Sequence, residues 1–165
     1  LVSWNGGGFD LPVLHYRAML HHISAPMYWE IGEHYKEFRY NNYINRYHLR
    51  HVDLMDILSL YQARAAQPLD QIAVFLGFPG KQGMDGSQVH DAYRAGKLAE
   101  IRQYCETDVI NTWLVYLRFQ LLRGEIFRPE YDAEIALVRD MLSSSQKPHL
   151  QEFLDAWKQP EAKPD

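Results

Sequence analysis

The sequence predicts an α/β fold in which helices dominate. Two short apolar stretches, residues 1–4 and 52–54, have the length and character of strands, and we expect the first to be buried. Each leads into a segment with helical spacing of apolar residues. A third observation is the long helical pattern over residues 98–123. In α/β proteins, functional sites form where strands end and helices begin.

The elements follow one another with recognisable boundaries. Gly6-Gly7-Gly8 predicts a tight turn after the first strand, and Asp10 can cap a helix that ends near Ile23. Gly124 is expected to end the longest helix. Further helices are expected at residues 55–63, 69–76, 89–95, 98–123, 130–145 and 149–157. We predict a single domain over residues 1–157 and a flexible tail over residues 158–165, which is rich in proline and charge.

Composition limits the classes of function. The 165 residues are 47% hydrophobic and 23% charged, as in an ordinary globular domain. A formal net charge of −4 provides no general attraction for nucleic acids or acidic membranes, so a polyanion would need a local basic patch or metal ions. The single cysteine, Cys105, excludes an internal disulfide and fits a reducing cytoplasm. We find no signal peptide or transmembrane run and expect a cytoplasmic protein without membrane contact.

Asp10 and Asp108 are carboxylates in otherwise apolar settings. The residues that share one face of the longest predicted helix are Ile101, Tyr104, Asp108, Thr112, Val115, Phe119 and Leu122. An unpaired carboxylate on such a face becomes protonated or costs several kcal/mol, and a divalent cation resolves both problems. The alternatives are a buried pair with an arginine or a cap of a neighbouring helix for Asp108, and an ordinary helix cap for Asp10.

Residues 39–50 interleave positive charge with aromatic rings and include Arg46 and Tyr47. This pattern suits an unpaired nucleic acid strand, because rings stack on bases and guanidinium groups meet phosphates. The alternative is a solvated loop whose tyrosines pack inward.

Several motifs in order resemble a known family. They are Asn5-Gly6-Gly7-Gly8-Phe9-Asp10, residues 51–56, 76–81 and 85–89, and a late Tyr104-x-x-x-Asp108 within residues 104–111. The first and the last resemble the second and third motifs of the DEDD 3′–5′ exonucleases, in the branch that has the tyrosine. Over roughly residues 1–124, the chain is similar to the stand-alone bacterial proteins related to the proofreading domain of family B DNA polymerases.

The resemblance implies an RNase H-like fold and a pair of divalent ions, Mg²⁺ or Mn²⁺, held by four acidic residues. Asp10 matches the third of these acids and Asp108 the fourth, while Tyr104 matches the tyrosine that orients the attacking water. Asn5 and Phe9 match positions along the path of the 3′-terminal nucleotide, and Gly6 lies between them. The glycine-rich loop at residues 79–87 would be a neighbour of this site.

The first two acids of the family lie in an Asp-x-Glu motif on a strand that precedes this segment. We expect that motif upstream of Leu1, and we expect the 165 residues to be inactive without it. The predicted function is a metal-dependent exonuclease that acts on the 3′ end of a single strand, DNA rather than RNA, and releases nucleoside monophosphates. The alternative is a non-catalytic domain that binds nucleic acid or another protein.

Overall fold

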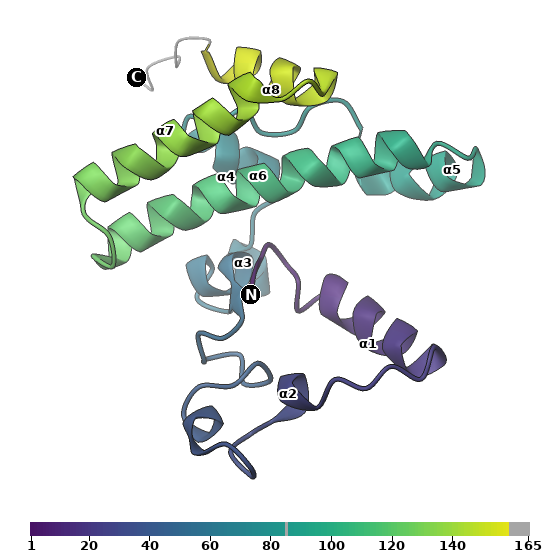
Figure 1. Ribbon diagram of the computed structural model, residues 1–165, viewed down its shortest axis with the longest axis vertical. Coiled ribbons are helices and arrows are strands. Elements are labelled where there is room, and N and C mark those ends of the chain that lie inside the picture. Colours follow the sequence, from purple (N-terminus) through teal and green to yellow (C-terminus); the bar gives the residue numbers. More distant parts are fainter. Residues whose placement is uncertain (85, 159–165) are drawn as a thin grey trace. The chain divides into compact units, whose positions relative to one another are not determined.

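The computed structural model describes residues 1–84 and 86–158. The chain divides into two compact units, unit 1 (Leu1–Gln67) and unit 2 (Pro68–Asp165). Figure 1 shows the elements of each unit. The prediction of one exonuclease-like domain over residues 1–157 stays a prediction.

Unit 1 combines a small sheet with short helices. Its elements are β1 (Val2–Ser3), α1 (Asp10–Leu20), α2 (Pro26–Trp29), η1 (Lys36–Arg39), β2 (Val52–Asp53), α3 (Leu54–Leu58) and η2 (Ala63–Ala65), where η denotes a 3₁₀ helix. The strands β1 and β2 pair in parallel, with Val2 opposite Val52 and Ser3 opposite Asp53. Both predicted strands are therefore confirmed.

Three details of unit 1 differ from the sequence prediction. The start of β1 is open to solvent, with Val2 36% exposed, rather than buried. Helix α1 ends at Leu20, before Ile23; Phe9 precedes its first residue, and no side chain caps it, so the predicted cap by Asp10 is wrong. Helix α3 ends at Leu58 rather than at residue 63.

The early end of α3 has a backbone cause. Leu60 and Tyr61 both have positive φ values, 52° and 61°, and residues in that left-handed conformation cannot continue a right-handed helix. Apolar spacing alone gives no warning of such a turn, because neither residue is one that favours it.

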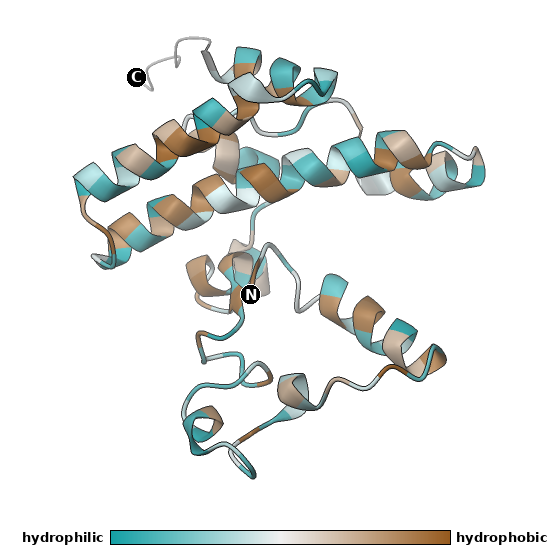
Figure 2. Cartoon of the chain, viewed as in Figure 1, coloured by the Kyte–Doolittle hydropathy of each residue, from teal (hydrophilic) through white to brown (hydrophobic). Residues whose placement is uncertain are grey.

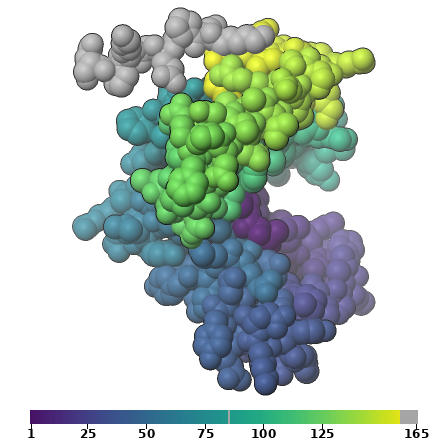
Figure 3. Space-filling view, turned by 60° about the vertical axis from the view of Figure 1, so that its left-hand side comes forward, coloured from purple at the N-terminus to yellow at the C-terminus, as the bar shows by residue number. Residues whose placement is uncertain are grey.

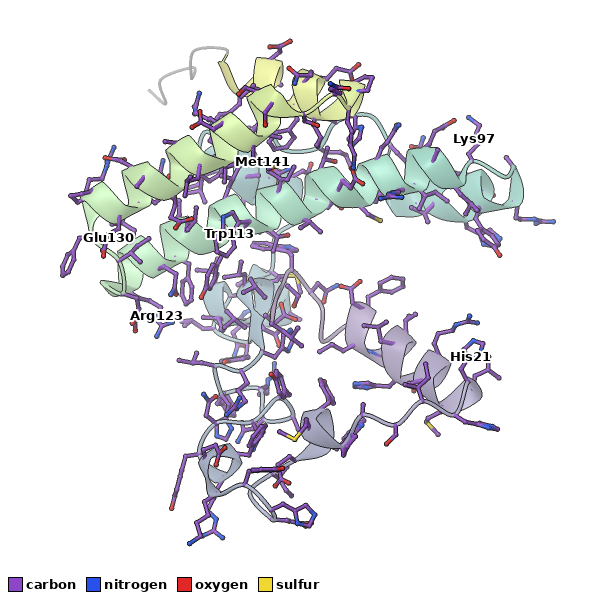
Figure 4. All side chains as sticks on the ribbon, viewed as in Figure 1. His21, Lys97, Trp113, Arg123, Glu130 and Met141 are labelled. Carbon is purple, nitrogen blue, oxygen red and sulfur yellow. The ribbon has the colours of Figure 1, made fainter. Side chains whose placement is uncertain are left out.

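Unit 2 consists of helices among its described residues. They are α4 (Leu69–Phe75), η3 (Gly86–Gln88), α5 (Val89–Arg94), α6 (Leu98–Arg123), α7 (Arg128–Ser144) and α8 (Pro148–Lys158). The predicted helices of this region are confirmed within a few residues. Figure 4 labels Lys97 and Arg123 at the two ends of α6, and Gly124 ends this helix with a φ of 74°. The backbone of Lys158 is helical, and the rest of the predicted tail lies outside the described residues.

Helix α6 is the centre of unit 2 and contacts α4, α5, α7 and α8. Apolar bands alternate with polar ones along α6 and α7 (Figure 2), and α7 and α8 lie side by side on one face of the unit (Figure 3). Leu114, Leu142 and Phe153 are fully buried. Val115 and Phe119 are buried as the predicted helix face requires, but Leu122 is 77% exposed, so that face does not extend to the end of α6.

The helix-rich α/β class is confirmed, and the RNase H-like topology stays a prediction. Within the described part of the chain, no helix combines the length and apolar character that a bilayer crossing requires.

Candidate functional site

A glycine turn follows β1 and carries the first group of predicted site residues. Asn5 has a φ of 60°, a left-handed conformation that asparagine tolerates better than most residues. Its carbonyl oxygen accepts hydrogen bonds from the N–H groups of Gly8 and Phe9, at 3.1 and 3.2 Å. The chain therefore reverses over three glycines and enters α1 at Asp10.

Asp53, the last residue of β2, fixes this turn. One of its carboxylate oxygens accepts a hydrogen bond from the Asn5 N–H at 2.9 Å, and the other accepts one from the Gly7 N–H at 2.8 Å. The side chain is buried. The parallel register explains the contact, because it places Asp53 beside Ser3, at the point where β1 runs into the turn.

The glycines of the turn are required by close packing. A Cβ atom at Gly6 would collide with the Ser3 hydroxyl, and one at Gly8 would collide with the Asn5 side chain. Ser3 is in turn hydrogen-bonded to the Nε2 atom of His51 at 2.8 Å. A side chain at residue 6 would therefore displace Ser3, and one at residue 8 would displace Asn5, one of the predicted substrate contacts.

Asp10 and Phe9 point away from the interior of unit 1. Both are exposed, and Asp10 is the first residue of α1, where a negative charge is favoured by the helix dipole. In residues 1–84 and 86–158, Asp10 has no hydrogen-bond or ion-pair partner. Its carboxylate is therefore available to an external cation, and the Phe9 ring is available to an external base.

The second group of predicted site residues lies on α6 in unit 2. Tyr104 and Asp108 are one helical turn apart, and the tyrosine hydroxyl donates a hydrogen bond to the Asp108 carboxylate. Burial raises the pKa of the Asp108 carboxyl, and the Tyr104 hydrogen bond and the charge of Lys81 act in the opposite direction. Tyr104 and Asp108 thus lie on one face of α6, as predicted, and they also contact each other.

The glycine-rich loop lies near this pair, as the family resemblance implies. A Cβ atom at Gly86 would be 3.5 Å from the Tyr104 hydroxyl, and the charges of Lys81 and Asp70 both act on Asp108. A half-buried carboxylate with a raised pKa is a good ligand for a cation, because the cation stabilises the ionised form that burial disfavours.

Asn111 holds the start of that loop. Its side-chain amide is 1% exposed and donates a hydrogen bond to the Gly80 carbonyl at 2.7 Å. Gly80 has a φ of 68°, and a Cβ atom there would collide with Val74. Asn111 is one turn beyond Asp108 on α6, so the same helix carries the carboxylate and positions the residue that precedes Lys81.

Arg46 and Tyr47 lie in unit 1, where the structure supports elements of both sequence interpretations. Arg46 pairs with Asp56 at 2.9 Å and lies over the Tyr61 ring, 4.5 Å from its centroid. Tyr47 contacts the same ring edge to face, with 4.9 Å between centroids. Arg46 and Tyr47 nevertheless remain exposed, so one face of each is open to a strand.

The structure thus gathers Asn5, Gly6, Phe9 and Asp10 on one turn of unit 1, and Tyr104 and Asp108 on one helix of unit 2. Sequence reasoning missed the anchoring roles of Asp53 and Asn111. Their partners are 46 to 48 residues away for Asp53 and 31 residues away for Asn111, so no local pattern marks them. No group of three or more histidine, cysteine or acidic side chains suited to a metal occurs among the described residues.

Comparison with known families matches residues 1–157 to one family model, described as a predicted 3′–5′ exonuclease related to the exonuclease domain of PolB. The match extends well beyond the motifs that carry the resemblance. No curated protein and no solved structure matches the chain significantly.

Proposed function

The chain belongs to the family of predicted 3′–5′ exonucleases related to the exonuclease domain of PolB, and from this premise we propose that it performs metal-dependent hydrolysis at the 3′ end of a DNA single strand. The reaction adds water across the terminal phosphodiester, breaks the bond to the 3′ oxygen and releases a nucleoside monophosphate. We place this chemistry on an RNase H-like domain in a reducing cytoplasm, which the single cysteine fits.

The observation that carries the proposal is the pair formed by Tyr104 and Asp108. The tyrosine hydroxyl donates a hydrogen bond to the Asp108 carboxylate, and a hydroxyl oxygen is also a hydrogen-bond acceptor, so the pair offers a water molecule an acceptor beside a carboxylate. A water held in this way has a fixed orientation beside a carboxylate. Such positioning is what the attack on a phosphodiester requires.

Asp10 and Asp108 are the carboxylates proposed to hold Mg²⁺ or Mn²⁺. Hard divalent ions prefer carboxylate oxygens and water, and Asp10 has no competing partner among the described residues. When bound, a pair of such ions supplies charge stabilisation for the attacking and leaving oxygens. Lys81, whose charge acts on Asp108, adds a positive group beside the same carboxylate.

Asn5, Gly6 and Phe9 are proposed to bind the terminal nucleotide. The Phe9 ring is exposed and can stack on a base. Asp53 holds the backbone N–H of Asn5, and the Asn5 side chain lies close to Gly8, so the turn that carries Asn5 is preformed. A preformed contact of this kind costs less ordering entropy when the strand binds.

The resembled mechanism uses four acids, and Asp10 and Asp108 provide two of them. We therefore propose that residues 1–165 alone bind metal and strand weakly, and that hydrolysis needs a segment with the Asp-x-Glu pair. Stepwise shortening of a strand by residues 1–165 in Mg²⁺ or Mn²⁺ would contradict this part of the proposal.

The test of the function compares linear and circular single strands of equal length by fluorescence anisotropy, with Mg²⁺ or with EDTA. A 3′-end site predicts tighter binding of the linear strand, loss of that preference in EDTA, and loss of it in the variant Asp108→Asn. Asp140→Asn, an exposed acid on α7, is the matched control. Equal affinity for both strands, independent of metal, would favour the non-catalytic nucleic-acid-binding alternative, and no binding at all would favour a protein-interaction domain.

A further inference from the structure

Unit 1 contains a pocket of about 220 Å³ that most of the predicted site residues do not reach. Its lining combines apolar, aromatic and charged side chains with the backbone of the glycine turn: Gly7, Leu11, Pro12, His15, Tyr28, Trp29, Tyr43, Ile44, Arg46, His51, Asp53 and Asp56. The residues from α1 are on its half-buried face, whereas Asp10 is on the exposed one. The pocket is therefore a separate feature from the carboxylates proposed to hold metal.

Aromatic rings form one wall of the pocket. Tyr28 and Tyr43 stack with their centroids 5.5 Å apart, and His15 contacts Tyr28 and Trp29 at 5.0 and 4.9 Å. The cluster is not closed, because Trp29 is 53% exposed. An exposed ring that neighbouring rings hold in place can stack on a further planar group.

His15 has an unsatisfied polar atom in this pocket. Its Nε2 atom is buried and has no hydrogen-bond partner in the part of the chain that the structure describes. A buried polar atom without a partner is unfavourable and indicates a site that a ligand or an ordered water completes. Burial also raises the pKa of the neighbouring Tyr28, so its hydroxyl stays protonated and able to donate.

The charges in the pocket select the kind of ligand. Asp53 and Asp56 line it together with Arg46, and Arg46 is already paired with Asp56. Two carboxylates would repel a phosphate placed inside the pocket, whereas they would not repel a neutral ring with polar edges. Arg46 is 52% exposed at its side chain and uses one nitrogen for Asp56, so its remaining donors can reach a phosphate outside the pocket.

Size narrows the ligand further. The volume is below the roughly 300–1,000 Å³ of sites that enclose drug-sized molecules. A single heteroaromatic ring system fits this space and a whole dinucleotide does not. We therefore propose that this pocket binds one unpaired base of the single-stranded substrate, with Trp29 stacked on it and His15 hydrogen-bonded to its edge. The inference rests on the proposed function for the identity of the strand.

The test places one abasic site at successive positions of a single-stranded DNA and measures binding by anisotropy in Ca²⁺. In the unsubstituted protein, one position is expected to lose about 5- to 100-fold in affinity, the loss of one base–aromatic stack. In Trp29→Ala, the intact strand should bind more weakly by a similar factor. An abasic site at that position should then cause no further loss of affinity. His15→Ala should give the same pattern with a smaller loss. Tyr16→Ala, an exposed aromatic neighbour on α1, is the matched control and should retain the full position dependence.

The outcomes separate this inference from the proposed function. If the strand binds at its 3′ end but every abasic site lowers the affinity of Trp29→Ala as much as that of the unsubstituted protein, the proposed base pocket is wrong. The exonuclease proposal then still stands. An equal effect of Tyr16→Ala would likewise overturn the pocket. If no variant and no strand shows binding, the proposed function itself fails. Circular dichroism of each variant verifies that the fold is kept. We expect this for Trp29→Ala because the Trp29 side chain is exposed.

Discussion

Unit 2 is stabilised by an extended apolar core, whereas unit 1 has a smaller one, with Phe38, Val52 and Leu54 buried, and depends more on polar side chains that hydrogen-bond to its backbone. Leu114, Leu142 and Phe153 are fully buried in unit 2, while α1 of unit 1 has no buried residue. In unit 1, the buried side chains of Glu30, Asn42 and Asp53 accept hydrogen bonds from nearby or distant N–H groups.

The difference shows how each unit serves a site. Unit 1 presents turns and exposed rings. Its irregular backbone lacks the hydrogen bonds of helices and sheets, so buried polar side chains hold it in place instead. Unit 2 presents one carboxylate and one hydroxyl on a long, well-packed helix. The predictions below test this contrast by removing a representative interaction from each unit.

The largest expected effect is in the apolar core of unit 2. Phe153→Ala should lower the free energy of unfolding by about 3–5 kcal/mol, because it removes a fully buried ring and leaves a cavity. Denaturant unfolding followed by circular dichroism measures the loss. Phe75→Ala removes the same ring where it is 82% exposed and should change stability by no more than about 0.5 kcal/mol. Similar losses in both variants would contradict the assigned core.

The polar anchor of unit 1 should have the next largest effect. Asp53→Asn keeps the shape but leaves only one acceptor oxygen for the N–H groups of Asn5 and Gly7, so we expect a loss of about 1.5–3 kcal/mol. Amide exchange at residues 5 and 7, measured by NMR, should become faster. Asp56→Asn removes a partly exposed ion pair and should cost only about 0–1 kcal/mol. Unchanged exchange in Asp53→Asn would show that the turn does not depend on this carboxylate.

The loop beside Asp108 should respond more modestly. Asn111→Ala removes the hydrogen bond to Gly80, but it also removes a buried amide oxygen that has no partner among the described residues. The two effects oppose each other, and we expect a net loss of about 0.5–1.5 kcal/mol with faster amide exchange at residues 79–84. Val109→Ala, at an exposed position of α6, is the control. If exchange in the loop is the same in both variants, Asn111 does not position it.

The smallest expected effects concern stability as a function of pH, which should change in a different pH range for each unit. Burial lowers the pKa of His51 in unit 1 from 6.5, so the unfolded form binds a proton first and unit 1 loses stability as the pH falls below about 6.5. Hydrogen bonds from Lys147, His149 and Arg102 lower the pKa of Glu106 in unit 2 from 4.5 to about 2, so this stabilisation is present above pH 4.5 and is lost as the pH falls toward 2. Hydrogen exchange resolved to each unit follows both changes. His51→Gln should flatten only the first and Glu106→Gln only the second; the reverse assignment would contradict the cited environments.

Sequence reasoning succeeded where local signals determine the structure. The long helix from Leu98 to Arg123 follows from apolar spacing and from Gly124, which adopts the expected left-handed conformation. The placement of Tyr104 and Asp108 on one helix face follows from their separation of four residues. The family relationship rests on motifs that are contiguous in the chain, and the match over residues 1–157 confirms it.

The same reasoning failed where the residue types give no signal for the backbone conformation or where distant residues decide the outcome. Helix α3 stops early because Leu60 and Tyr61 adopt a conformation that their residue types disfavour. The turn at residues 5–10 is shaped by Asp53, which the sequence places in another segment and which pairing of β1 with β2 brings alongside. The aromatic pocket joins α1, α2 and the segment around Tyr43, and no spacing rule links these three.

The central proposal is that the Asp108 carboxylate, which Tyr104 contacts on α6, binds a divalent cation. The most direct test is a Mn²⁺ titration followed by paramagnetic broadening of the amide signals next to Asp108. We predict that these signals broaden as Mn²⁺ is added, and that Asp108→Asn removes the broadening while Asp140→Asn does not. Broadening around residue 108 that Asp108→Asn leaves unchanged would contradict a metal site at this carboxylate.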